Sequence, residues 1–412
     1  MKPIRIALFA VALAGAFAAR ADVVTDWNEK AVAAAYMPYT NAGAAAGAPT
    51  LGARMVTITG IATFEAVNSI DKRYTPYRKL LPAEASWPKE VAASAAARAV
   101  LARLGPQEKQ QEYTAMHQAI LAKFQDGDAK SKAVALGEAS AAAILAEREG
   151  DGSNTVNDWR PVTAPGQYVV TQFPAAINWA KTKPFGLARG DQFRAPPPMA
   201  LTSATWARDY NEVKRMGGKV GSARTEEQTR IAKFWEMVGP GTYNPMGVQL
   251  VMANKLDLTD CARAMALLAI ATHDASVAVF DSKYTYNFWR PVTAIRNGDI
   301  DGNDATERDD KWEPFIPTPM HPEYPCAHCT IQSATATVLQ SIYGNDIAEV
   351  KLTSTAAPGV TRTFRRLSDY ADEVIEARIY DGVHYRTSGE VGRDLGRQVG
   401  QYVAANYFKP IK

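Results

Sequence analysis

The sequence predicts an all-α protein whose helices form bundles. Residues 85–150 are rich in Ala, Glu, Lys, Leu and Gln, which are strong helix formers. Helical patterns return repeatedly between residues 201 and 404, whereas short β-like runs, such as residues 54–60, are few. Because the chain shows neither a βαβ rhythm nor an internal repeat, packed helices are favoured over an α/β fold.

Residues 1–21 are predicted to be a secretory signal peptide. Lys2 and Arg5 precede a short apolar core, and Ala19-Arg20-Ala21 provides an A-x-A cleavage site. The core is too short for a membrane span, and no later stretch approaches about 18 uninterrupted apolar residues. We therefore expect an exported protein, periplasmic or secreted, that has no membrane span.

Charge and cysteine content exclude two classes of protein. The whole sequence has 46 basic and 43 acidic residues, and three of the basic ones (Lys2, Arg5 and Arg20) lie in the signal peptide. The mature chain is therefore close to neutral and has no charge excess that indicates a nucleic-acid partner. Three cysteines do not make a disulfide scaffold.

The mature chain is predicted to have two parts. Residues 85–150 should form two or three amphipathic helices, with breaks at 104–109 and 124–131. Residues 150–200 are rich in Gly, Pro and aromatic residues and predict a long irregular connection that ends at three consecutive prolines. We therefore divide the chain into an N-terminal helical region, residues 22–199, and a C-terminal helical bundle, residues 200–412.

The C-terminal bundle is predicted to contain one long buried helix that carries charges. Helices are expected at about 201–216, 224–238, 244–254, 257–288, 326–343 and 366–404. The helix at 257–288 is apolar on most faces and nevertheless carries His273, Asp274, Asp281 and Lys283. Buried charges need partners or a ligand. Asp274 could pair with a site cation or orient a histidine, or it could be purely structural.

Lys283 and Arg290 form the first candidate cluster. Their spacing of seven residues places them on one helix face, about 10 Å apart. Pro291 disfavours helical geometry at the preceding residue, so this helix should end at Arg290. The alternative is that both cations simply pair with buried acids.

Arg378 and His384 form the second cluster. A spacing of six residues would point the two side chains apart on a continuous helix, but Gly382 allows the backbone to break between them. The two side chains could then reach one site. The alternative is a surface arginine and a histidine with an ordinary structural partner.

The third cluster is "PCAHC", residues 325–329. Pro325 precedes a good helical run, so Cys326, Ala327 and His328 should lie at a helix N-terminus, where free N–H groups and the helix dipole favour an anion. The small side chain of Ala327 would let an anion approach its amide.

The two cysteines of this stretch admit other interpretations. A thioredoxin-like redox pair needs a βαβ context, which is absent. A structural zinc site needs four ligands, and only His321, His328 and the distant Cys261 could complete one. A disulfide between Cys326 and Cys329 is compatible with export; it would protect the thiols and remove Cys326 as a hydrogen-bond donor.

Taken together, the clusters predict a site for a tetrahedral oxyanion. They supply three cations, a helix N-terminus and two histidines. Three cations around one point attract a multiply charged oxyanion, while one histidine can bond to its central atom and the other can move a proton. The predicted ligand is phosphate or its analogue vanadate.

These motifs resemble the superfamily that joins the vanadium-dependent haloperoxidases with the type 2 phosphatidic acid phosphatases. The family signature K-x6-R-P, P-S-G-H and S-R-x5-H is matched, in order, by "KYTYNFWRP" (283–291), "PCAH" (325–328) and "ARIYDGVH" (377–384). The wider context "FWRPVTAIR" and the length of the chain favour the haloperoxidase branch. The resemblance covers the C-terminal half and implies a helical-bundle fold.

The resemblance also implies a role for each matched residue. Lys283, Arg290 and Arg378 would hold the oxygens of vanadate, together with the amide of Ala327. His384 would be the ligand to the metal, or the nucleophile that accepts phosphate in a phosphatase. His328 would be the acid–base residue.

The implied activity is a vanadate-dependent peroxidase whose substrates are hydrogen peroxide and a halide. His321 lies where bromoperoxidase-like members have histidine and chloroperoxidase-like members have phenylalanine, which favours bromide over chloride. An oligomer is compatible with the sequence.

Three positions depart from the family pattern, and two departures are mild: Ala327 replaces the glycine of the second motif and still has an N–H, and Ala377 replaces the serine of the third. Cys326 stands where the family has a serine that donates to the oxyanion, and a thiol is a poorer donor that peroxide oxidises. The departure favours two alternatives: an acid phosphatase that hydrolyses phosphate esters through a phosphohistidine, or an oxyanion-binding protein without catalysis.

Overall fold

The computed structural model describes residues 22–37, 49–155, 158–170 and 174–411, so the predicted signal peptide lies outside the described residues. The N-terminal helices are α1 (Val23–Ala34), α2 (Pro49–Asp71), α3 (Lys89–Leu104), α4 (Gln110–Leu121) and α5 (Asp128–Glu147). The C-terminal elements are α6 (Ala204–Gly217), α7 (Glu226–Phe234), α8 (Asn244–Ala253), α9 (Leu258–Tyr286), α10 (Pro291–Arg296), α11 (Ala327–Tyr343), β1 (Asp346–Ser354), β2 (Ala357–Arg366), α12 (Leu367–Tyr380) and α13 (Arg386–Asn406).

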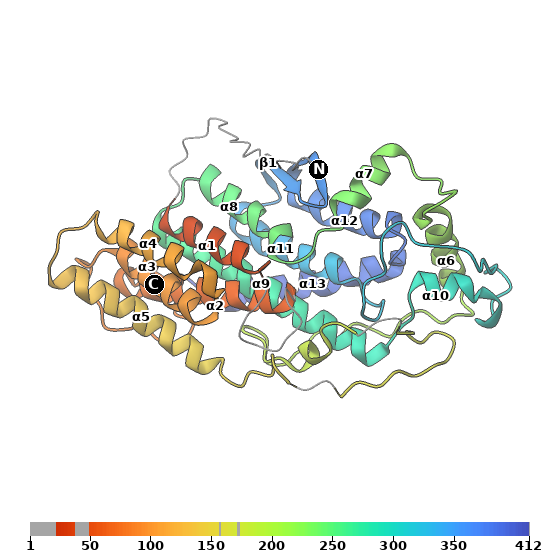
Figure 1. Ribbon diagram of the computed structural model, residues 1–412, viewed down its shortest axis with the longest axis horizontal. Helices are drawn as coiled ribbons and strands as arrows, with labels where there is room; N and C mark the ends of the chain where they lie inside the picture. Colours follow the sequence, from red (N-terminus) through yellow and green to blue (C-terminus); the bar gives the residue numbers. More distant parts are fainter. Residues whose placement is uncertain (1–21, 38–48, 156–157, 171–173, 412) are drawn as a thin grey trace, which may run out of the picture.

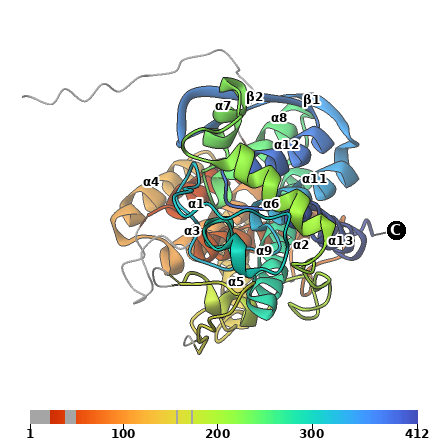
Figure 2. The ribbon, with the colours of Figure 1, turned by 90° about the vertical axis from the view of Figure 1, so that its right-hand side faces the viewer.

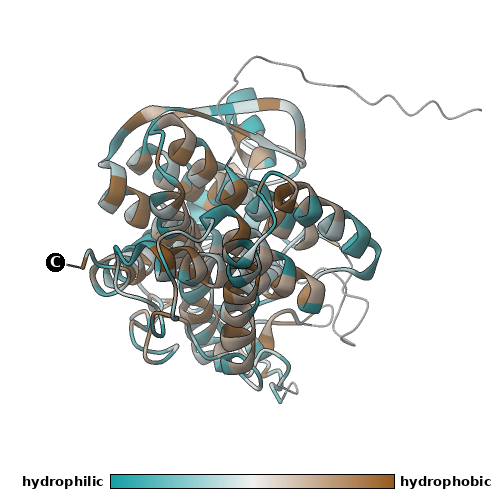
Figure 3. Ribbon diagram, turned by 90° about the vertical axis from the view of Figure 1, so that its left-hand side faces the viewer, coloured by the Kyte–Doolittle hydropathy of each residue, from teal (hydrophilic) through white to brown (hydrophobic). Residues whose placement is uncertain are grey.

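The helical fold is confirmed. Three helices, α3, α4 and α5, occupy the region where two or three were predicted, and the breaks between them fall where expected. In the described part of the connection from α5 to α6, regular helix is limited to a short 3-10 turn, Ile177–Lys181. The helices at the front of Figure 3 carry both apolar and polar positions, as expected for helices that cover a shared core.

The β-like pattern at residues 54–60 does not form a strand, because these residues lie inside α2. This helix is buried along most of its length, so its β-branched residues reflect burial and not a strand. The hydroxyl groups of Thr57, Thr59 and Thr63 each donate to the carbonyl four residues earlier, at 2.8–2.9 Å. Threonine is thereby accommodated inside a buried helix.

Helix α9 is the central element of the molecule. It packs against α2 on the N-terminal side and against α11 and α13 on the C-terminal side, and Figure 1 shows it running between the two groups of helices. By length and composition α9 could cross a membrane, but 94% of its most apolar window is buried inside the protein. Its apolar character is therefore that of a core helix.

One hydrophobic core joins the N-terminal and C-terminal helices. It includes residues from Val23 in α1 to Phe408 beyond α13. The C-terminal segment also pairs with the N-terminal region, because Thr75 N donates to Lys409 O and Ile411 N donates to Arg73 O, at 2.7 and 2.8 Å. The division of the chain at residue 199 stays a prediction, and the core crosses that boundary.

An antiparallel hairpin, β1–β2, interrupts the helical bundle between α11 and α12. Figure 2 shows it at the edge of the molecule, and its strands contact α8, α7 and α12. Val350, Leu352 and Phe364 face inward and are buried, while charged residues such as Lys351 are exposed. This alternation is typical of a sheet with one solvent-exposed face.

Candidate oxyanion site

The first motif lies at the end of α9. The helix ends at Tyr286, because Asn287 adopts a left-handed conformation with φ of 50°. The prediction that it would continue to Arg290 is therefore wrong. Arg290 is extended and directly precedes Pro291 and α10, as expected for a residue before proline. Lys283 and Arg290 are nevertheless both buried in the same region.

Both cations hold the segment that leads to the second motif. Lys283 Nζ donates to the carbonyl oxygens of Pro322 and Glu323, both at 2.8 Å. Arg290 Nε donates to His321 O at 2.9 Å, and Arg290 Nη2 lies 3.0 Å from His321 Nδ1. His321, predicted as a possible outer residue of the site, therefore contacts one of its cations directly.

The third motif reaches the same point through a break in the backbone. Helix α12 ends at Tyr380, and Gly382 has a φ of 78°, which glycine adopts without strain. His384 then turns inward, with Nε2 3.2 Å from Arg290 Nη1. Arg290 Nη1 also donates to Val383 O at 2.8 Å. The predicted break at Gly382 is confirmed.

Arg378 occupies the last turn of α12 and faces the same centre. Its Nη1 atom lies 2.7 Å from Asp381 Oδ2 and donates to Trp235 O at 3.2 Å. Among the described residues, Arg378 Nε is buried without a hydrogen-bond partner. A donor in this state is ready for an acceptor on a ligand.

The "PCAHC" stretch begins α11 as predicted. Cys326 is the N-cap residue and Ala327 is the first helical residue, so the amide of Ala327 has no acceptor within the helix. Cys326 and Cys329 form a disulfide. His328, which is half-buried, lies with Nε2 3.0 Å from Met237 O. The structure thus contains the disulfide that the sequence allowed, and no thiol donates at position 326.

Burial shifts the ionisation of every charged residue around this centre. Burial, reinforced by Arg290, lowers the pKa of Lys283 far below its usual value, and burial lowers the pKa of Arg290 to about 10. Burial also raises the pKa of Glu323 and of Asp381 to about 7, although Lys283 and Arg378 respectively oppose the shift. Three cations here face two carboxylates that resist ionisation. An anion would offset the positive excess.

The two histidines of the site are held neutral. Burial and then Arg290 lower the pKa of His384 far below its ordinary value. Burial and then Arg378 lower the pKa of His328 to about 3. Neutral imidazole has one nitrogen with a free lone pair, which can bond to an electrophilic centre or accept a proton.

These residues fit a tetrahedral oxyanion such as vanadate or phosphate. Lys283, Arg290 and Arg378 supply buried positive charge, and the unpartnered Nε of Arg378 supplies a free donor. This donor set therefore suits an anion bound through its oxygens and one histidine.

The structure brings most of the predicted site residues together and places one elsewhere. Hydrogen bonds join Lys283 to the segment before the second motif and Arg290 to His384 of the third, so the structure brings the three motifs together.

For Asp274 the structure favours the structural alternative, because its partners lie away from the three motifs. Its carboxylate accepts from the backbone N–H groups of residues 185–187 at 2.5–2.8 Å and contacts His273 at 3.1 Å. Asp274 therefore anchors the long connection to α9.

Two carboxylates of the site were not predicted from the sequence. Glu323 Oε1 lies 2.7 Å from His384 Nδ1, and Asp381 pairs with Arg378. A search for acids close to the motifs could have found both, because Glu323 lies just before "PCAH" and Asp381 lies inside the third motif. The requirement that buried cations have partners was the available signal.

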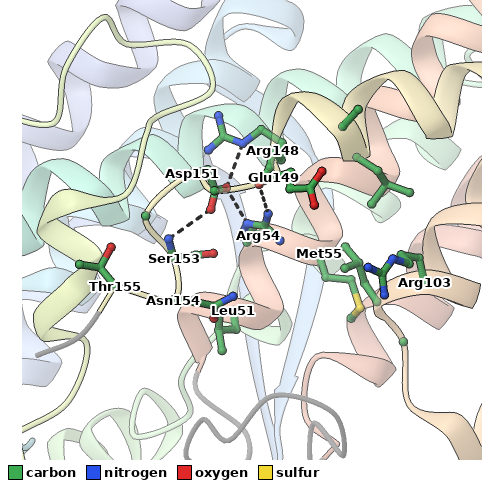
Figure 4. Close-up of a pocket in the computed structure, with 16 residues that line it drawn as sticks. Leu51, Arg54, Met55, Arg103, Arg148, Glu149, Asp151, Ser153, Asn154 and Thr155 are labelled. Carbon is green, nitrogen blue, oxygen red and sulfur yellow. Dashed lines mark hydrogen bonds and ion pairs between the residues drawn. The ribbon is translucent and has the colours of Figure 1, made fainter.

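A cavity of about 630 Å³ lies apart from this site, between the start of α2, the end of α3 and the segment after α5 (Figure 4). Arg54 and Arg148 both pair with Asp151 beside it, at 2.7 and 3.1 Å. These ion pairs hold the segment after α5 against α2. The residues that line the cavity include no member of the three motifs.

Comparison with known proteins gives a family match in the C-terminal part of the chain. The family described as the VCPO second helical-bundle domain matches residues 263–412, the range that contains all three motifs. Vanadium chloroperoxidase from Curvularia inaequalis is 24% identical over 297 residues, which is 54% of this chain and 47% of that protein. The chain therefore spans about half the length of this curated relative.

Solved structures extend the likeness to nearly the whole chain. A bacterial vanadium-dependent iodoperoxidase superposes with a TM-score of 0.79 at 22% identity, over 94% of this chain and 98% of that one. A holo-type bacterial vanadium-dependent chloroperoxidase superposes with a TM-score of 0.74 at 18% identity, over 93% and 97% of the two chains. The chain therefore has the vanadium haloperoxidase fold, including the helices that precede the VCPO-type domain.

Proposed function

We propose that this chain is a vanadate-dependent haloperoxidase that uses hydrogen peroxide to oxidise a halide. The observation that carries the proposal is the convergence of three buried cations on His384, whose Nε2 atom faces Arg290 and not a structural acceptor. The family of the C-terminal domain and the fold of the whole chain support it. When bound, vanadate supplies a Lewis-acidic centre that activates peroxide toward attack by a halide.

The three cations would hold the vanadate oxygens. Lys283 and Arg290 are fixed by carbonyl groups of the 321–323 segment, so their positions are set before the anion arrives. Arg378 would use its unpartnered Nε. His384 Nε2 would bond to vanadium, because only this nitrogen has a lone pair directed into the cluster.

His328 would move the proton of hydrogen peroxide. Its Nε2 atom faces the carbonyl of Met237, which accepts only, so the neutral ring carries its proton on Nε2. The lone pair is then on Nδ1. We infer that Nδ1 takes a proton from peroxide as it binds and later returns one to a departing oxygen.

Bromide is the halide that we propose, in preference to chloride. The proposal rests on His321 in place of the phenylalanine that chloroperoxidase-like members carry, and on the contact of His321 with Arg290. The structural neighbours include both an iodoperoxidase and a chloroperoxidase. Iodide, bromide and chloride should therefore be compared directly as substrates. We expect the protein to oxidise bromide and iodide and not chloride.

One observation favours acid phosphatase activity as a second candidate. The disulfide leaves Cys326 without a donor for the oxyanion, whereas the cations and His384 would also suit a phosphate ester. His384 Nε2 would attack phosphorus, His328 would protonate the leaving alcohol, and water would hydrolyse the phosphohistidine. The same disulfide weakens the argument against a peroxidase, because no thiol remains at position 326 for peroxide to oxidise.

A paired assay separates the candidates. The purified protein is tested for halide-dependent peroxidation and for phosphate-ester hydrolysis, with and without vanadate. Vanadate should activate the first reaction, whereas it would inhibit the second. His384→Ala should abolish whichever activity is present. The site assignment fails if neither activity appears and His384→Ala leaves vanadate and phosphate affinity unchanged.

We also propose that the protein is exported. The features of residues 1–21 support this proposal, as does the Cys326–Cys329 disulfide, because disulfides persist mainly in oxidising compartments. Sequencing the N-terminus of the protein recovered from its native cell is the direct test. A mature protein that retains Lys2 would contradict export through this signal.

A further inference from the structure

We propose that Glu323 is the positioning residue that fixes the tautomer of His384, so that Nε2 presents its lone pair to the bound oxyanion. The identity of that anion rests on the proposed function, whereas the hydrogen-bond geometry does not. Glu323 lies outside the three motifs, two residues before Pro325.

The first step of the argument is what each nitrogen of His384 faces. Nε2 lies 3.2 Å from Arg290 Nη1, and a guanidinium group can only donate. This contact favours a lone pair on Nε2 and a proton on Nδ1, but Arg290 Nη1 also donates to Val383 O at 2.8 Å, so Arg290 does not fix the tautomer by itself. Nδ1 lies 2.7 Å from Glu323 Oε1, and a carboxylate oxygen accepts a hydrogen bond from Nδ1–H.

The second step is that Glu323 is itself held in place. Its side chain is fully buried, and Oε1 also accepts from the backbone N–H of Tyr385 at 3.1 Å. The backbone carbonyl of Glu323 accepts from Lys283 at 2.8 Å. One residue thus fixes the ring of His384, the amide that follows it, and one of the site cations. Its position is set by packing and not by the ligand.

The third step is the consequence for anion binding. A histidine bonds to a metal centre through a nitrogen that carries no proton, and the hydrogen bond at the other nitrogen selects which one that is. Without Glu323, neither tautomer would have a partner at Nδ1, and the proton could occupy Nε2. That form cannot bond to vanadium or attack phosphorus. Glu323 therefore prepares the site before any anion is present.

The tautomer can be measured without vanadate or turnover. The chain contains five histidines, so ¹⁵N-histidine labelling gives few resonances, and His384→Ala assigns the relevant pair. Long-range ¹H–¹⁵N correlation at neutral pH should show the His384 proton on Nδ1 in the wild-type protein. A proton on Nε2 in the wild-type protein would overturn the proposal without the need for any variant.

Two substitutions at position 323 separate positioning from general stability. Glu323→Gln keeps an oxygen that accepts from Nδ1 and should retain the tautomer. Glu323→Ala removes the acceptor and should give a mixture of the two forms. Asp381→Asn is a matched control, because it alters the other buried carboxylate of the site and should leave the His384 tautomer unchanged. Loss of the tautomer in Asp381→Asn, or its retention in Glu323→Ala, would contradict the assignment.

Measuring vanadate affinity then tests whether the tautomer of His384 affects ligand binding. Removing the outer partner of a metal-bound histidine typically lowers metal affinity about 10–100-fold. Titration with vanadate, followed by ⁵¹V NMR, should show a loss of this size in Glu323→Ala and a smaller loss in Glu323→Gln. Equal affinity in the wild-type protein and Glu323→Ala would overturn the proposal. A wild-type protein that binds neither vanadate nor phosphate would instead contradict the proposed function.

Discussion

Single side chains of the oxyanion site are tuned by burial and by their charged neighbours. His328 shows this most directly, because burial and Arg378 together lower its pKa to about 3. A histidine that starts neutral has a lone pair available for a proton. The cations that attract the anion thus also help to keep His328 neutral. Anion binding and the pKa of His328 should therefore be coupled.

Anion binding should raise the pKa of His328. In the anion-free protein, burial and then positive charge lower the pKa of His328 to about 3, so the ring stays neutral at ordinary pH. Bound phosphate would offset Arg378 and Lys283, so the imidazolium form becomes less costly and the pKa moves upward. NMR titration of ¹⁵N-labelled histidine with and without phosphate measures the shift. His117, whose pKa is lowered by burial and Arg98 in the N-terminal region, should not respond.

At the scale of elements, the ends of helices position the functional groups. Helix α9 ends before Arg290, α11 begins at Ala327, and the gap between α12 and α13 carries His384. At Gly382 the backbone is both left-handed and in close contact with α6: an added Cβ would collide with Gly217 O. The glycine is needed for two independent reasons.

Gly382→Ala should destabilise the protein and displace His384. A left-handed conformation costs a non-glycine residue about 1 kcal/mol, and the collision with Gly217 adds to this. Gly359→Ala is the matched control, because Gly359 has a φ of 83° with open space around it. Urea unfolding should show a larger loss for Gly382→Ala, together with weaker vanadate binding. Equal losses in the two variants would show that the contact with α6 contributes nothing.

The start of α11 should bind an anion more tightly when a hydroxyl replaces the disulfide sulfur. Cys326→Ser combined with Cys329→Ala restores an N-cap hydroxyl that can donate to the oxyanion. Cys326→Ala with Cys329→Ala lacks that donor and serves as the control. One charge-assisted hydrogen bond contributes about 1.5 kcal/mol, which corresponds to about a 10-fold difference in vanadate dissociation constant. Indistinguishable constants would mean that residue 326 does not face the anion.

At the scale of the whole molecule, the N-terminal and C-terminal regions stabilise each other. Helix α9 contacts both, and the segment after α13 lies along residues 73–75 of the N-terminal region. Phe408 is fully buried, with its ring centroid 4.0 Å from that of Phe64 in α2. The residues before α6 therefore do more than cover the C-terminal bundle, because they share its core.

Phe408→Ala should destabilise the whole molecule. Truncation of a buried phenylalanine typically costs about 3–5 kcal/mol of unfolding free energy, since a cavity remains. Ile411→Ala, at a position that is 45% exposed, should cost far less. Denaturant unfolding followed by tryptophan fluorescence and by circular dichroism should give one coincident transition. Two separated transitions in the wild-type protein would contradict a shared core.

Sequence patterns were sufficient for the helical fold and for the candidate residues that the structure brings together. Helix-forming composition predicted α3–α5, and buried charge in an apolar helix pointed to Lys283. Errors arose where tertiary contacts override local signals. The β-like run at residues 54–60 is helical because its apolar residues are buried on several faces of α2. Asp274 binds three backbone amides almost 90 residues away, which no local pattern reveals.

The sequence by itself determined which residues are candidates to bind and react, because their types and spacing together favour an oxyanion as the ligand. Only the tertiary structure decided which hydrogen-bond partners their side chains have. The partner of His384 is Glu323, 61 residues earlier, and the partner of His328 is the carbonyl of Met237, 91 residues earlier. Hydrogen bonds between residues so far apart in the sequence depend on how the helices pack. The tautomer of each histidine is therefore a property of the fold and not of any motif.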